Sequence, residues 1–122
     1  MNFAHKEITE QVIGAAFEVY NVLGYGFLEK VYQRALQVEL LKRGLEAVVE
    51  PVIQVHYKGA IVGDYRSDLL VAEVVLVELK VAKEYNPNDE PQLLNALKAS
   101  NIKTGLLINF GRTKVEFKRM VF

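Results

Sequence analysis

The chain has 122 residues, 51% of them hydrophobic and 25% charged, and its formal net charge is zero. This length and composition predict one folded domain over residues 1–122 and exclude a disordered chain. The balanced charge argues against a protein that holds nucleic acid mainly through a strong nonspecific field.

Apolar residues at helical spacing begin the chain. They predict a helix over residues 6–22, ended by Gly24-Tyr25-Gly26, and a second helix over residues 27–43, capped by Gly44. We expect the second helix to lean on a sheet through one apolar stripe. That stripe consists of Val31, Ala35, Val38 and Leu41, with Leu28 and Tyr32 beside it.

Strand patterns dominate the rest of the chain. Three strands are expected over residues 47–57, 60–70 and 75–83, the first two joined at Lys58-Gly59. A third helix over residues 92–100 is followed by strands over residues 104–109 and 114–122. A helix between the third and fourth strands implies a crossover connection, so the sheet is expected to be mixed. The predicted fold class is therefore α/β (α+β), a central mixed β-sheet flanked by helices in the order ααβββαββ.

Charged residues interrupt the most apolar stretch, at Asp68, Glu78 and Lys80. Glu78 and Lys80 are two positions apart, so on a strand they share one face. A hairpin that turns at residues 72–74 places Asp68 directly opposite Glu78 and Arg66 opposite Lys80. The sequence therefore predicts that two carboxylates and an amine meet among apolar neighbours.

This combination points to metal-assisted chemistry. Carboxylates so close repel each other unless a cation lies between them, and Mg²⁺ prefers oxygen ligands of this kind. Lys80 would neutralise a developing negative charge or help to orient a water molecule. The three residues together suit phosphodiester hydrolysis assisted by a metal ion.

Structural explanations remain open for each candidate residue. Paired charges on a solvated sheet face are common, and a carboxylate such as Glu29 in the first turn of a helix is favoured by the helix dipole. Gln92 alone is typical of a helix surface. Neither His5 nor His56 has a second histidine nearby, and no G-x-S-x-G motif supports a serine hydrolase.

The order of motifs resembles a known family. Residues 26–32, Gly-Phe-Leu-Glu-Lys-Val-Tyr, are similar to the signature of the GxxExxY proteins, a bacterial and archaeal family placed in the PD-(D/E)XK nuclease superfamily. Further similar stretches are residues 57–59, 63–71, 77–80, 92–95 and 105–111. The chain departs from the family at residues 88–91, where a histidine often precedes the glutamine of the third helix. The resemblance implies a restriction-endonuclease-like core.

The resemblance also implies a set of site residues. Asp68 and Glu78 would bind Mg²⁺ or Mn²⁺, together with the backbone carbonyl of Leu79. Lys80 would position or help to deprotonate the attacking water and stabilise charge on the phosphate. The two auxiliary residues would be Glu29, which binds metal through water or orients Lys80, and Gln92, which contacts the metal-bound water or the phosphate.

We therefore predict a metal-dependent nuclease that hydrolyses DNA phosphodiester bonds, as a homodimer or with a protein partner. The alternative is a nuclease-fold binding or scaffold protein with weak or no catalysis, acting through a partner. The chain contains no cysteine, no signal-peptide pattern and no apolar run long enough to span a bilayer. These features predict a cytoplasmic protein without a membrane segment.

Overall fold

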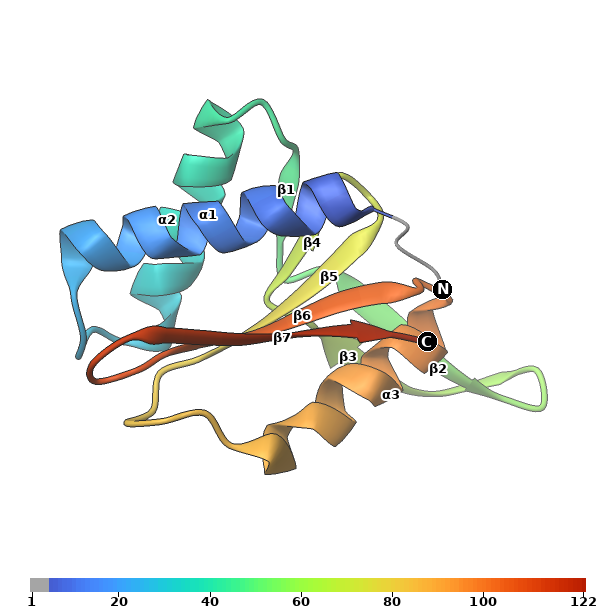
Figure 1. Ribbon diagram of the computed structural model, residues 1–122. Coiled ribbons are helices and arrows are strands. Elements are labelled where there is room, and N and C mark those ends of the chain that lie inside the picture. The colour runs from blue at the N-terminus through green and yellow to red at the C-terminus, as the bar shows by residue number, and fades with distance from the viewer. Residues whose placement is uncertain (1–4) are drawn as a thin grey trace.

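The computed structural model describes residues 5–122 as helices packed on both faces of a sheet (Figure 1). The helices are α1 (Lys6–Leu23), α2 (Glu29–Lys42) and α3 (Glu90–Ser100), with a short 3₁₀ helix, η1 (Pro87–Asp89), leading into α3. The strands are β1 (Ala47–Val49), β2 (Val52–Tyr57), β3 (Ala60–Arg66), β4 (Leu69–Val71), β5 (Val75–Lys80), β6 (Thr104–Phe110) and β7 (Val115–Val121). The predicted order of helices and strands is confirmed, although two of the predicted strands are divided.

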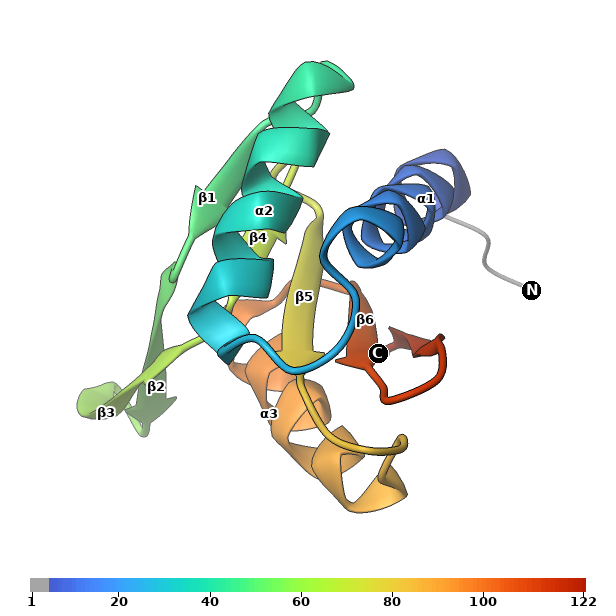
Figure 2. The same cartoon turned by 90° about the vertical axis from the view of Figure 1, so that its left-hand side faces the viewer.

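A five-stranded sheet in the order β1-β4-β5-β6-β7 forms the centre of the molecule. Adjacent strands of this sheet are antiparallel, except β5 and β6, which are parallel and are connected through α3. Helices α1 and α2 cover one face of this sheet, and α3 covers the other (Figure 2). The predicted mixed sheet flanked by helices is thus confirmed.

Two predicted strands each break in the middle and serve two sheets. The stretch 47–57 is divided at Glu50, whose φ is 53°, and at the following Pro51. The stretch 60–70 is divided at Ser67 and Asp68. The outer parts, β2 and β3, pair with each other as a separate two-stranded sheet, called the arm below, which extends to one side of the body (Figure 1).

The hairpin register around the turn is as predicted, but it ends earlier. Leu69 pairs with Val77, as the predicted turn at residues 72–74 requires. Arg66 does not lie opposite Lys80, because it belongs to the arm and pairs with Val52. The break at Ser67 and Asp68 turns the chain from one sheet into the other, so the predicted pairing of Arg66 is wrong.

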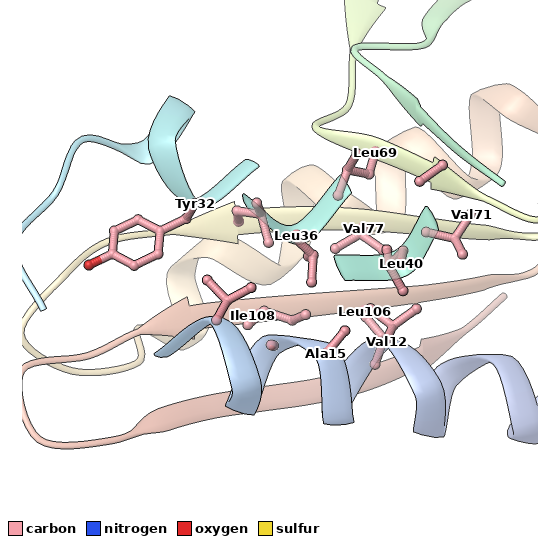
Figure 3. Close-up of a cluster of buried hydrophobic side chains, with 14 of the residues drawn as sticks. Val12, Ala15, Tyr32, Leu36, Leu40, Leu69, Val71, Val77, Leu106 and Ile108 are labelled. Carbon is pink, nitrogen blue, oxygen red and sulfur yellow. The ribbon is translucent and has the colours of Figure 1, made fainter. Parts of the chain in front are cut away.

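The main core fills the space between the sheet and helices α1 and α2 (Figure 3). From α2, the fully buried side chains are Tyr32, Leu36 and Leu40, and the Tyr32 ring stacks on Phe110 at 4.4 Å. The predicted stripe is wrong: Val38 and Leu41 are 53% and 54% exposed. The helix carries two apolar stripes, and packing against the sheet selected the one with the larger side chains.

A second, smaller cluster lies between the sheet and α3. It comprises Ile53, Leu76, Leu93, Ala96, Leu97, Leu107 and Met120. A Cβ atom on Gly105 would lie 3.1 Å from the methyl groups of Leu93, so glycine in β6 allows α3 to pack closely on the sheet. This packing holds the first turn of α3 next to the end of β5. Within residues 5–122, no helix has the length and apolar character needed to cross a membrane.

Candidate active site

The candidate site lies where β4 stops and β5 continues. The β4–β5 ladder ends at the pair Leu69–Val77, so the last residues of β5 have no β4 partner. The side chain of Asp68 takes the place beside β5 that a further β4 residue would occupy. Its Oδ2 accepts a hydrogen bond from the backbone N–H of Leu79 at 2.7 Å. In an antiparallel strand, the N–H and C=O of one residue point toward the same neighbour. The Leu79 carbonyl therefore points to the side of the strand where Asp68 lies.

Glu78 is the most buried carboxylate of the site, with 5% of its surface exposed. Its Oε1 accepts hydrogen bonds from the Tyr65 hydroxyl at 2.7 Å and from the Ser67 hydroxyl at 2.8 Å. Burial raises the pKa of Glu78 to about 7, and the charge of Asp68 adds to this, while the two hydroxyls and Lys80 act in the opposite direction. A nearby cation would favour the ionised form of this buried carboxyl group and so would be attracted to it.

Glu29 approaches Asp68 from the first turn of α2. Partial desolvation raises the pKa of Glu29, and the neighbouring charge of Asp68 raises it further. The pKa of Asp68 is also raised, chiefly by burial, although the N–H of Leu79 opposes that shift. The backbone of Asp68 is fixed by Gln33, whose Nε2 donates to the Asp68 carbonyl at 3.0 Å. A small pocket of about 90 Å³ lies here, lined by Glu29, Lys30, Gln33, Glu50 and Asp68.

Lys80 and Gln92 complete the arrangement from the side of α3. The Lys80 Nζ donates to the Gln92 Oε1 at 3.4 Å, and the charge of Lys80 lowers the pKa of Glu29, Asp68 and Glu78. Strand alternation puts Lys80 on the same face of β5 as Glu78. The five side chains singled out in the sequence therefore converge on one place, although they come from α2, the β3–β4 junction, β5 and α3.

The donor atoms at this place fit a hard divalent cation. They are all oxygens, and the second oxygen of Glu78, Oε2, accepts no hydrogen bond from the described residues. Within residues 5–122, no three acidic, histidine or cysteine side chains stand close enough to hold a metal ion by themselves. Mg²⁺ commonly binds through one or two carboxylates and keeps several waters, so two carboxylates and one backbone carbonyl form a suitable set.

Three further polar residues contact the site and were not singled out in the sequence. Tyr65 and Ser67 hold Glu78, and the buried Gln33 holds Asp68. Gln33 lies four residues after Glu29, so helical spacing could have indicated it. No comparable spacing signal exists for Tyr65, which approaches Glu78 only because the chain leaves the arm at Ser67.

Comparison with known proteins extends these observations. The crystal structure of SSO0001 has the same fold, with a TM-score of 0.57 and 16% sequence identity. That match covers 96% of this chain and 58% of the other, so this chain spans somewhat more than half the length of that protein. None of the curated proteins compared matches the chain.

A family model provides the assignment. The model of the PD-(D/E)XK nuclease superfamily matches residues 6–120, which include every helix and nearly all the strand residues described above. Both comparisons support a restriction-endonuclease-like α/β fold, as the sequence motifs implied. The chain therefore belongs to the PD-(D/E)XK nuclease superfamily.

Proposed function

We propose that this protein is a divalent-metal-dependent nuclease that hydrolyses phosphodiester bonds of DNA. One observation carries the proposal: Asp68, Glu78 and Lys80 meet at the end of β5. There Asp68 is hydrogen-bonded to the backbone N–H of Leu79, and Lys80 is hydrogen-bonded to Gln92. Buried carboxylates with raised pKa values beside a lysine are typical of catalytic sites.

The cation would be held by the Asp68 and Glu78 carboxylates and the Leu79 carbonyl, with Mg²⁺ or Mn²⁺ as the expected ion. When bound, such an ion polarises the phosphate and lowers the pKa of a coordinated water. The protein's own residues then orient the reactants. Lys80 presents a positive charge to the phosphate oxygen that gains negative charge, and the Gln92 amide keeps the lysine directed into the site.

Glu29 is proposed as an auxiliary acid. Its pKa is raised by desolvation and by Asp68, so it retains a proton at a higher pH than an ordinary glutamate. In this state it shares a hydrogen bond with Asp68 without adding a second negative charge. Glu29 would thereby keep Asp68 oriented, and after losing its proton it would bind the ion through a water molecule.

Several finer assignments belong to the same proposal. We propose that the chain is a GxxExxY-type member whose residues 1–122 form one catalytic domain. We also propose that it works in the cytoplasm, and that it acts on duplex DNA as a homodimer or with a protein partner. A pair of sites would allow both strands of a duplex to be cut.

Metal binding provides the first test. Titration calorimetry of the metal-free protein with Mg²⁺ and Mn²⁺ should show binding to the wild type that is lost in Asp68→Asn. The substitution keeps the side-chain size and removes the charge that attracts the cation. Asp64→Asn is the matched control, because Asp64 is exposed on the arm and, by strand alternation, lies on the opposite face of β3 from Tyr65. Equal affinities in the wild type and Asp68→Asn would contradict the site assignment.

Cleavage of linear, circular and single-stranded DNA provides the second test. The wild type should cut at least one form in the presence of Mg²⁺ or Mn²⁺, and chelation should stop it. RNA in the same assay decides whether the activity is restricted to DNA. A wild type that binds the metal but cuts no nucleic acid, alone or at high concentration, would favour the alternative of a nuclease-fold scaffold protein.

A further inference from the structure

Glu78 is held through only one of its two carboxylate oxygens by the described side chains. Both of its hydrogen bonds from side chains reach the same oxygen, Oε1, at 2.7 Å from Tyr65 and 2.8 Å from Ser67. The hydroxyl of Ser67 is almost completely buried, with 1% of the residue exposed. Two donors on one oxygen fix the rotation of the carboxylate group and leave Oε2 for another partner.

The two donors come from the arm and from its junction with the main sheet. Tyr65 lies in β3, near the base of the arm, and Ser67 is the residue between β3 and Asp68. The Ser67 hydroxyl is also 3.2 Å from the carbonyl of Val77, which ties the junction to β5. The path of the chain from the arm into β4 thus sets both where Asp68 lies and which way Glu78 faces.

The Tyr65 hydroxyl also connects Glu78 with the opposite side of the site. The pKa of Tyr65 is raised, first by burial and then by its hydrogen bond to Glu78, while a hydrogen bond with Gln92 opposes the shift. Gln92 in turn accepts from Lys80. Tyr65 and Lys80 therefore both approach the Gln92 side chain, so the groups that hold Glu78 are neighbours of those that hold Lys80.

We infer that Tyr65 and Ser67 are positioning residues, which together hold Oε1 of Glu78 so that Oε2 is presented to a divalent cation beside Asp68. This inference rests on the proposed function. The inference adds that the arm contributes to the site, because its strand β3 supplies Tyr65, which orients the proposed metal ligand Glu78. Groups that orient metal ligands commonly affect metal affinity or activity by about 10–100-fold.

The two substitutions that remove one hydroxyl each are Tyr65→Phe and Ser67→Ala. Either leaves one donor on Oε1, so the carboxylate gains freedom to rotate. We expect Mn²⁺ affinity, measured by calorimetry on the metal-free protein, to fall by about 10-fold in each variant. The turnover kcat for DNA should fall by a similar factor, whereas KM should stay within about twofold because neither hydroxyl is assigned to substrate.

Matched controls separate positioning from a general structural effect. Tyr57→Phe removes a hydroxyl from the same arm, at a residue that is 61% exposed, and should leave Mn²⁺ affinity unchanged. The melting temperature of metal-free Tyr65→Phe should remain close to that of the wild type. In a Glu78→Gln background, adding Tyr65→Phe should cause no further loss of Mn²⁺ affinity, because glutamine keeps the oxygen that Tyr65 holds but has no second carboxylate oxygen to present to the cation.

The outcomes distinguish this inference from the proposed function. If the wild type neither binds Mn²⁺ nor cleaves nucleic acid, the proposed function fails and the inference fails with it. If the wild type binds Mn²⁺ and cleaves, while Tyr65→Phe and Ser67→Ala match it in affinity and kcat, only the inference is overturned. Equal losses in Tyr65→Phe and Tyr57→Phe would likewise overturn it, since the arm would then act as a whole rather than through Glu78.

Discussion

The two faces of β5 have opposite characters. Val75, Val77 and Leu79 point into the main core with α1 and α2, and none has any exposed surface. On the other face, Leu76 joins the smaller cluster under α3, and Glu78 and Lys80 continue toward the site. Strand alternation thus puts core residues and site residues on one short strand. Successive residues are separated by a rise of only about 3.4 Å along the strand.

This contrast separates the residues that stabilise the fold from those that we propose act on a substrate. The core face gains stability from burial and close packing. The site face includes a buried carboxylate whose pKa is raised by that burial, which means that its charged form is disfavoured in the folded protein. Substitutions on the two faces should therefore have different signatures, and neighbouring residues of β5 allow a direct comparison.

The largest effect on stability is expected from the core face, at Leu79→Ala. The side chain is completely buried, and its truncation leaves a cavity between the sheet and the helices, so the free energy of unfolding should fall by about 2–5 kcal/mol. Urea unfolding measures this change. The backbone carbonyl of residue 79 is retained, so the folded fraction should keep Mn²⁺ affinity within a fewfold of the wild type. A loss below 1 kcal/mol would show that the core face is not tightly packed.

The next residue along the strand should give the reverse signature. Lys80→Ala removes a cation from the site face, so cleavage of DNA should slow by about 10²–10³-fold, equivalent to ~3–4 kcal/mol of the activation barrier. Mn²⁺ affinity should be equal or higher, since a repelling charge is lost. Lys80→Arg should not restore the rate, because a guanidinium is wider and planar. A Lys80→Ala protein with wild-type kcat would remove the lysine from the catalytic set.

Much of this contrast could be read from the sequence. The turn at residues 72–74 and the apolar flanks were enough to predict the pairing of Leu69 with Val77, and therefore the approach of Asp68 to Glu78. Local patterns carry this information because a hairpin register depends on its own turn. The helices were also predictable, with ends shifted by up to about two residues.

Other features depended on contacts between distant parts of the chain. Pro51 cannot donate to a strand ladder and so was a local sign of a break, but nothing local showed that β1 and β2 would join different sheets. Both apolar stripes of α2 satisfy helical spacing, and only the position of the sheet decides which one is buried. Tyr65 reaches Glu78 across the junction of two sheets, a contact that no spacing rule describes.

The smallest expected effect is a gain in stability, at Glu78→Gln in the metal-free protein. Glutamine keeps an oxygen that accepts from Tyr65 and Ser67 but removes the charge that burial disfavours. Because the folded-state pKa of Glu78 is about 7, above the ordinary glutamate value of 4.5, the folded protein binds the proton more tightly than the unfolded chain does. The stability linked to this proton is complete below the unfolded pKa and is lost as the pH rises through about 7. With a chelator present, the two proteins should therefore melt at similar temperatures near pH 4. At pH 8 Glu78→Gln should melt higher, by about 4–8 °C for each ~1 kcal/mol gained in the free energy of unfolding.

Glu73→Gln, at the exposed turn of the same hairpin, is the control and should show no such difference. A lower melting temperature for Glu78→Gln at pH 8 would instead mean that the ionised carboxylate stabilises the fold through Lys80, and the two faces of β5 would then both be structural.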